Sequence, residues 1–161
     1  LKLRSNIPNY ARFVFECFNE PGRAAFAESA AAVRDAGRAG VIVAGESYGQ
    51  GSSREHAAIC PMYLGVRVVL ALSIERIHAA NLVNFGILPL LFARSEDRER
   101  IEPGDQIVIE DVAEQLRSGD GVVTVALLKN GERCAELRTT HGLSAEDCAT
   151  ILAGGRLNMI D

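Results

Sequence analysis

The pattern of hydrophobic and polar positions predicts strands and helices that alternate through the first part of the chain. Short apolar runs rich in β-branched residues are typical of buried strands. Alanine-rich or amphipathic stretches that end at a glycine, as at Gly37 and Gly86, are typical of helices. We therefore expect strands over 41–44, 66–72 and 88–92 and helices over 21–36, 52–64 (kinked near Pro61) and 74–85 (capped by Ser73).

The second part of the chain predicts antiparallel strands. Asn130-Gly131 separates two alternating runs, 122–128 and 133–138, and Asn-Gly in this position is the strongest short signal of a β-hairpin. A further strand is expected over 105–109, and Ser144 begins a closing helix that runs through Leu152. A strand before this hairpin and a helix after it favour a mixed sheet with flanking helices.

Two details refine this α/β prediction. Pro89 lacks the N–H group that a central strand uses, so the 88–92 strand is expected at an edge of the sheet. The stretch 1–18 is expected to be extended and then mixed, with Pro8 limiting any helix before it. We find no repeat or linker, and we expect residues 1–161 to form a single compact domain.

Composition is that of an ordinary globular domain: 161 residues, of which 48% are hydrophobic and 24% charged. The net charge of −4 argues against a general surface for polyanions, so nucleic acid is not an expected partner. No apolar run approaches the roughly 18 residues of a membrane span. The start at Leu1 shows neither a methionine nor a signal peptide. We therefore expect a piece of a longer protein that is located in the cytoplasm.

The four cysteines are widely scattered, and no pair has the short spacing of zinc or iron–sulfur ligands. Without an export signal, a chain of this size needs no disulfide framework. We expect reduced cysteines that mostly fill the core, and no metal site in this chain. They are Cys17, Cys60, Cys134 and Cys148.

The most informative segment is the stretch from Glu46 to His56, which follows a predicted strand directly. Gly49 and Gly51 allow positive φ and a close approach to a ligand. Arg54 and the free N–H groups at the start of the next helix form a site for a carboxylate or phosphate. Open α/β sheets place their ligands at this end of a strand. The segment therefore predicts an anion site.

Other interpretations of the same segment explain less. Ser52 and Glu55 fit a capping box, but capping requires neither the two glycines nor the arginine. The spacing matches neither the dinucleotide fingerprint, the P-loop nor the nucleophile elbow. His56 lies close to Ser52 on the same predicted helix, yet no acid is present to orient it, so a catalytic triad is not supported.

The two hydroxyls of this segment make proton transfer possible. A serine is a base only as its alkoxide, and both a guanidinium and aligned N–H groups stabilise that anion. Either Ser52 or Ser53, beside Arg54, is a reasonable base on these grounds. An arginine also holds a carboxylate through two hydrogen bonds, which orients a substrate.

These residues resemble a known family. The stretch from Gly45 to Ala58 is similar to the signature of the aconitase C-terminal swivel domain. The resemblance spans nearly the whole chain and is densest over 41–92; further matching segments are 63–67, 76–82, 85–90 and 153–158. It implies a swivelling β/β/α domain of the aconitase and isopropylmalate isomerase superfamily.

The resemblance implies a hydro-lyase that isomerises citrate to isocitrate through cis-aconitate. Ser52 matches the serine whose alkoxide takes the proton from the carbon next to a carboxylate. Ser53 and Arg54 match residues that bind carboxylates of the tricarboxylate substrate, and Arg4 matches a further carboxylate-binding arginine. The [4Fe-4S] cofactor, a Lewis acid, is held in the family by three cysteines of other domains, and no cysteine here matches them. The chain is therefore expected to bind no cluster and to be inactive without the cluster-bearing domains as partners.

For the remaining polar residues near the loop we expect structural or interdomain roles rather than catalytic ones. We expect His56 to be structural or interdomain and His78, on an apolar helix face, to be a hydrogen-bonded packing residue. Arg76 and Asn81 either stabilise the loop or contact the other domains, and Glu46 is a candidate to orient Arg54. Their roles stay open at the level of sequence.

Two alternatives to an aconitase remain. One is the small subunit of an isomerase or dehydratase for isopropylmalate, homoaconitate or methylisocitrate; Arg4 argues against isopropylmalate, which would favour an apolar contact there. The other is an RNA-binding or regulatory fragment. The negative charge and the lack of a dense Lys/Arg cluster with aromatics argue against this second alternative.

Overall fold

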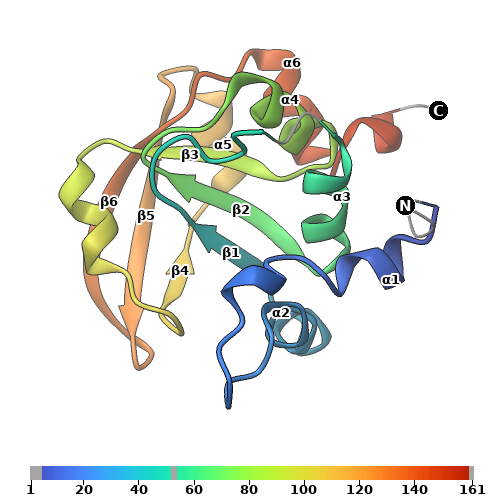
Figure 1. Ribbon diagram of the computed structural model, residues 1–161. Helices are drawn as coiled ribbons and strands as arrows, with labels where there is room; N and C mark the ends of the chain where they lie inside the picture. The colour runs from blue at the N-terminus through green and yellow to red at the C-terminus, as the bar shows by residue number, and fades with distance from the viewer. Residues whose placement is uncertain (1–4, 52–53, 160–161) are drawn as a thin grey trace.

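The computed structural model describes residues 5–51 and 54–159, and within them six strands form one mixed sheet (Figure 1). The strand order is β1-β2-β3-β6-β5-β4. The pairs β1–β2 and β2–β3 are parallel, and the other three neighbouring pairs are antiparallel. The strands are β1 Gly40–Val43, β2 Val66–Ala71, β3 Leu88–Phe92, β4 Gln106–Val108, β5 Val122–Lys129 and β6 Glu132–Thr140. The α/β class with a mixed sheet is confirmed.

The helices divide between the parallel and the antiparallel parts of the sheet. α1 to α4 come from the first part of the chain, where helices connect parallel strands, and α5 and α6 flank the β5–β6 hairpin in sequence (Figure 1). The helices are α1 Ile7–Ala11, α2 Phe26–Asp35, α3 His56–Tyr63, α4 Arg76–Asn84, α5 Val112–Arg117 and α6 Ala145–Leu152, with short 3-10 turns at Glu16–Phe18, Ser95–Arg100 and Arg156–Met159.

The largest apolar cluster lies inside the curve of the sheet. It contains buried side chains of β2, β3, β5 and β6, and α5 and α6 add Leu116 and Cys148. Val43 of β1 and Ile107 of β4 both pack against it, although these strands stand at opposite ends of the strand order. A hydrogen bond joins the same two ends of the sheet: Nε of Arg98, in the 3-10 turn before β4, donates to the carbonyl of Ala44, which follows β1, at 3.3 Å. The sheet therefore curls around this cluster.

The other face of β1 and β2 is covered by helices. Ile42 and Val69 pack there with Ala58 of α3 and Leu82 of α4. A third cluster, which includes Ala11, joins α1, α2 and α3. Neighbouring residues such as Val69 and Leu70 thus belong to different clusters, as the alternation of side chains along a strand requires. This double coverage explains why β2 is apolar from Val68 to Ala71, whereas Arg67 near its start is exposed.

Most predicted elements are confirmed. Asn130 and Gly131 form the two-residue turn of the β5–β6 hairpin with φ of 52° and 83°, as a type I′ turn requires. Ser144 caps α6, and its hydroxyl and Asp147 make the reciprocal hydrogen bonds of a capping box. Gly37 and Gly86 follow the ends of α2 and α4 with positive φ.

Other predictions are wrong in position. β3 is an interior strand rather than an edge strand. Its pairing with β6 includes only Leu91 and Phe92, so no hydrogen bond to β6 is required of the residue at position 89, and a proline is tolerated there. α2 begins at Phe26 rather than near 21, and α4 begins at Arg76 rather than at 74. The short helix α5 was not predicted at all.

Candidate functional site

The glycine loop, defined here as residues 44–55, connects the end of β1 to α3. Its first half continues the pairing of β1 with β2 beyond the strands. The Leu72 N–H donates to the Gly45 carbonyl at 3.1 Å, and the Tyr48 N–H donates to the Ser73 carbonyl at 3.0 Å. The Glu75 N–H in turn donates to the Tyr48 carbonyl at 2.9 Å. This first half of the loop is therefore fixed along the β2–α4 connection, at the carboxyl ends of two parallel strands.

Ser73 takes part in this attachment instead of capping α4. Its hydroxyl accepts a hydrogen bond from the Ser47 N–H at 2.7 Å, and Glu75 occupies the N-cap position of α4. Ser47 has a φ of 52°, a left-handed conformation that is uncommon for residues other than glycine. The hydrogen bond from the Ser47 N–H to Ser73 holds the chain in that conformation. The serine that was predicted to cap α4 therefore stabilises the loop instead.

The two glycines adopt the backbone conformation that the sequence predicts. Gly49 has a φ of 90° and Gly51 a φ of 74°. Space is restricted only at Gly49, where a Cβ atom would lie 2.4 Å from both Cβ and Cγ of His78. At Gly51 none of the described residues has an atom within 4 Å of that position. Gly49 is thus needed for its lack of a side chain as well as for its conformation.

His78 lies beneath the loop on the first turn of α4. Its side chain is 2% exposed and meets the Tyr48 ring edge-on, with ring centroids 5.1 Å apart. Neither ring nitrogen has a hydrogen-bond partner among the described residues. The expectation that His78 is a packing residue is confirmed. The hydrogen bond that was also expected for its ring is absent among the described residues. An unpaired buried polar group costs about 1–3 kcal/mol.

Burial also changes the protonation of these two side chains. Desolvation lowers the pKa of His78 below its ordinary value, because burial penalises the charged imidazolium. The same cause raises the pKa of Tyr48 to about 12. The imidazole and the phenol are therefore both neutral near neutral pH, and the floor of the loop carries no charge of its own.

Arg54 follows the glycines with an exposed side chain. Within residues 5–51 and 54–159, no hydrogen bond or ion pair involves its guanidinium, and exposed Glu46 does not pair with it. α3 begins at His56 with Glu55 as N-cap, so the helix starts later than predicted and Glu55 does not stand at the third helical position of a capping box. The predicted site residues Ser52, Ser53 and Arg4 lie outside the described residues.

The other polar residues near the loop either pack against neighbouring elements or lie at the surface. The His56 ring meets the Tyr10 ring edge-on at 5.4 Å, which ties the start of α3 to α1. Arg76, the first residue of α4, is exposed, and Asn81 is half-buried in the same helix. The contact of His56 agrees with the expected structural role.

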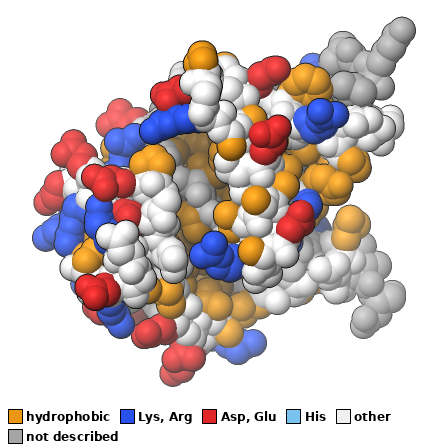
Figure 2. All heavy atoms as spheres, turned by 90° about the horizontal axis from the view of Figure 1, so that it is seen from below, with side chains coloured by type: hydrophobic (Ala, Val, Ile, Leu, Met, Phe, Trp, Pro, Cys, Tyr) orange, Lys and Arg blue, Asp and Glu red, His pale blue; other side chains and the backbone are white. Residues whose placement is uncertain are grey.

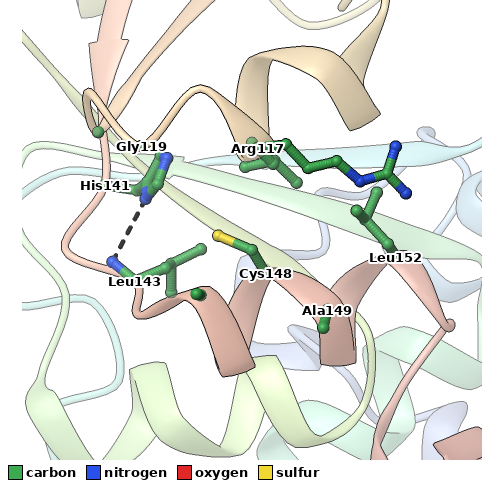
Figure 3. A pocket seen from close by; sticks show the side chains of 10 residues that line it. Arg117, Gly119, His141, Leu143, Cys148, Ala149 and Leu152 are labelled. Atoms are coloured by element: carbon green, nitrogen blue, oxygen red, sulfur yellow. Dashed lines mark hydrogen bonds between the residues drawn. The ribbon is translucent and has the colours of Figure 1, made fainter.

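A separate cavity of about 590 Å³ lies between α5, α6 and the segment that follows β6 (Figure 3). Its walls are largely apolar, and Cys148 projects from α6 toward His141 (Figure 3). His141 Nδ1 already accepts a hydrogen bond from the Leu143 N–H at 3.3 Å. Burial raises the pKa of the Cys148 thiol and lowers the pKa of His141. The cavity therefore offers a neutral thiol and a neutral imidazole, and no activated nucleophile.

The described residues contain no group of three or more His, Cys, Asp or Glu side chains that would hold a metal ion. Cys60 and Cys148 are buried, whereas Cys17 and Cys134 are exposed, and all four are free thiols. The expectation that cysteines mostly fill the core is thus met by two of them. This part of the chain does not fit the ligand set of an iron–sulfur cluster. It also has no helix long and apolar enough to cross a membrane.

Comparison with known proteins adds the decisive observation. Residues 16–95, which include the glycine loop and β1 to β3, match the family model of the aconitase C-terminal domain. The chain belongs to the aconitase C-terminal domain family. A 3-isopropylmalate dehydratase from Methanocaldococcus jannaschii has the same fold, with a TM-score of 0.56 and 29% identity over 73% of this chain and 60% of that chain.

The curated relatives are much longer enzymes of the same family. A putative mitochondrial aconitate hydratase of Emericella nidulans is 43% identical over 125 residues, which are 77% of this chain and 16% of that protein. A mitochondrial homocitrate dehydratase of Saccharomyces cerevisiae is 34% identical over 128 residues, again 77% of this chain and 16% of that protein. The chain thus spans about a sixth of the length of these relatives. The expectation of a cytoplasmic location is wrong by this comparison, because the relatives are mitochondrial proteins.

Proposed function

We propose that this chain supplies part of the active site of a mitochondrial aconitate hydratase. The observation that carries the proposal is the exposed guanidinium of Arg54, which has no partner among the described residues and directly follows the glycine loop. An arginine guanidinium holds a carboxylate through two parallel hydrogen bonds, and Arg54 lies just before the first residue of α3. The first half of the loop is fixed to the β2–α4 connection, which supports a preformed site.

Each site residue has a specific role in this proposal. Ser52, as an alkoxide, takes the proton from the carbon next to a carboxylate of citrate, the hydroxyl of the neighbouring carbon leaves as hydroxide and takes up a solvent proton to become water, and cis-aconitate forms. In the second half a water gives its proton back to solvent and adds as hydroxide to one carbon, Ser52 returns its proton to the other, and isocitrate and the alkoxide result. Ser53, Arg54 and Arg4 hold substrate carboxylates, and the two arginines are suited to bidentate contacts. Ser52, Ser53 and Arg54 lie within residues 16–95, which match the family model, and this supports their roles; Arg4 lies outside that match.

The [4Fe-4S] cluster of the family belongs to other domains, and the described residues of this chain do not fit it. The chain is therefore proposed to work only together with cluster-bearing domains and to be inactive alone. The curated relatives are consistent with this arrangement, because their matched segment is a small part of a longer enzyme.

A second candidate is a related hydro-lyase with another acid as substrate. It is favoured by the similarity to a homocitrate dehydratase and to the solved 3-isopropylmalate dehydratase. Steady-state assays of the complete enzyme with citrate, homocitrate and isopropylmalate separate these substrates. A preference for citrate of tenfold or more in kcat/KM is expected, and a preference for either other acid would replace the first candidate by the second.

An RNA-binding role has weaker support. On the face seen in Figure 2, acidic and basic side chains are interspersed around a hollow with apolar side chains. The net charge is −4. The described residues on this face form no continuous basic stripe of the kind that phosphate backbones require. Salt-dependent retention of RNA by the chain would contradict this assessment.

The test of the proposed function uses the complete enzyme that contains this chain, loaded with its cluster. Ser52→Ala is expected to lower kcat about 100- to 10,000-fold, which is the range for loss of a general base. Arg54→Lys is expected to raise KM, because a lysine cannot form the bidentate contact. The matched control is Arg38→Lys at another exposed arginine, and it should change neither constant. Full turnover by the Ser52→Ala enzyme would refute the assignment of the base.

A further inference from the structure

His78 is a buried polar residue that the proposed mechanism does not use. It lies on the first turn of α4 with 2% of its side chain exposed, and both ring nitrogens are closed off from solvent without a partner among the described residues. Native proteins rarely leave such groups unpaired, and a specific exception calls for an explanation. A phenylalanine would fill similar space without that cost. The presence of histidine therefore points to a use of its nitrogen atoms.

The glycine loop lies directly against this ring. A Cβ atom on Gly49 would lie 2.4 Å from His78 Cγ and 2.6 Å from Cδ2, so the loop backbone rests directly on the imidazole. The Tyr48 ring stands edge-on to the same imidazole, with an interplanar angle of 67°. His78 is thus the floor of the loop at the residues that lead to Arg54.

The loop has free hydrogen-bond donors at this place. The N–H group of Gln50 donates to the Ser47 carbonyl at 3.0 Å, whereas those of Gly49 and Gly51 donate no hydrogen bond within the described residues. A neutral imidazole presents one acceptor nitrogen and one N–H donor. Burial lowers the pKa of His78 and so keeps that acceptor available near neutral pH. An unpaired acceptor and two unpaired donors therefore lie on adjoining segments.

We propose that His78 is a positioning residue for the carboxylate site, and that in the assembled enzyme its acceptor nitrogen binds the N–H group of Gly49 or Gly51. The bond fixes the distance between α4 and residues 49–51 of the loop, and hence the position of Arg54. Since His78 acts through the loop, it contacts no substrate itself. This inference rests on the proposed function only for its effect on turnover.

The experiment compares His78→Phe and His78→Gln in the complete enzyme. Phenylalanine preserves a ring but removes both nitrogens, whereas glutamine keeps an amide that can accept the same hydrogen bond. We expect His78→Phe to be at least as stable to heat as the parent enzyme and to have a kcat at least ~10-fold lower, because a misplacement of about 1 Å costs roughly 100-fold. His78→Gln should recover a substantial part of kcat. KM should change less than kcat in both variants.

A purely structural role predicts the opposite order in kcat, with phenylalanine a better replacement than glutamine. That order, or an unchanged kcat in His78→Phe, would overturn the proposal. The matched control is His141→Phe, which removes a half-buried imidazole beside the α5–α6 cavity. It should leave kcat and KM unchanged.

Hydrogen exchange separates this inference from the proposed function. In the complete protein without substrate, the amides of residues 45–51 should exchange faster in His78→Phe than in the parent and the His78→Gln proteins. If the parent enzyme turns over none of the tested acids, the proposed function fails, and exchange alone decides the role of His78. Equal exchange in the parent and His78→Phe proteins would refute it.

Discussion

Replacement of Gly49 by alanine tests whether α4 supports the glycine loop. Two costs add at this position. A left-handed conformation costs an L-residue roughly 1–2 kcal/mol, and Gly49 has a φ of 90°. In addition, the new Cβ would lie 2.4 Å from His78 Cβ, an atom next to the α4 backbone that has little freedom to move. Overpacking of this kind costs about 1–3 kcal/mol.

Gly51→Ala is a matched control in the same loop. Gly51 also has positive φ, at 74°, but no atom of residues 5–51 and 54–159 lies within 4 Å of its Cβ position. Gly51→Ala should therefore show only the first cost, about 1–2 kcal/mol, and Gly49→Ala a total of about 2–5 kcal/mol. The difference, about 1–3 kcal/mol, isolates the contact with His78.

Thermal and urea unfolding of the two variants measure this difference. For a domain of this size, 1 kcal/mol shifts Tm by about 2–4 °C, so Gly49→Ala should unfold roughly 2–12 °C below Gly51→Ala. If the two variants unfold at the same temperature, the loop is not seated on His78. The positioning role of that residue would then lose its structural basis.

Three further predictions concern the rest of the fold. Ser144→Ala removes the capping box of α6 and should lower the free energy of unfolding by about 1 kcal/mol in urea titrations, whereas the exposed Ser95→Ala should not. Gly131→Ala, at a φ of 83° with open space around it, should cost roughly 1–2 kcal/mol, and a neutral result would contradict the turn geometry. Arg94 and Arg100 hydrogen-bond buried Asp97 and hold its pKa below the ordinary value, so Asp97→Asn should cost about 1 kcal/mol near pH 7, a discounted figure because both arginines are largely exposed. A depressed pKa stabilises the fold above the ordinary pKa and loses that effect as the pH falls through the folded value, so the difference in Tm should shrink below about pH 4 and a constant difference would refute the attribution.

Local signals in the sequence were sufficient where the physical cause is local. The Asn130-Gly131 turn and the Ser144 cap depend on a few consecutive residues, and both form as predicted. The edge position predicted from Pro89 failed for a different reason. Whether the residue at position 89 must donate a backbone hydrogen bond depends on how far β6 extends along β3. The register of the β5–β6 hairpin determines that extent. Such a distant pairing leaves no mark near Pro89 itself.

The same distinction applies to the candidate site. Positive φ at Gly49 and Gly51 and an exposed Arg54 followed from the residue types alone. The attachment of the loop to Ser73 did not, because a serine before a helix is the usual pattern of an N-cap. The close contact of Gly49 with His78 was also invisible, since it joins two segments that only the parallel pairing of β1 and β2 brings together.

The far end of α4 suggests why the family resemblance resumes near the end of the chain. A Cβ atom on Gly86 would lie 2.5 Å from the backbone carbon of Gly154, and one on Gly155 would lie 3.0 Å from the Asn84 carbonyl oxygen. The last turn of α4 is therefore packed directly against the Gly154-Gly155 backbone. His78 lies on the first turn of this helix, beneath the glycine loop. A helix that is held at both ends can support the loop at a fixed height, so the terminal glycines contribute to the site without approaching it.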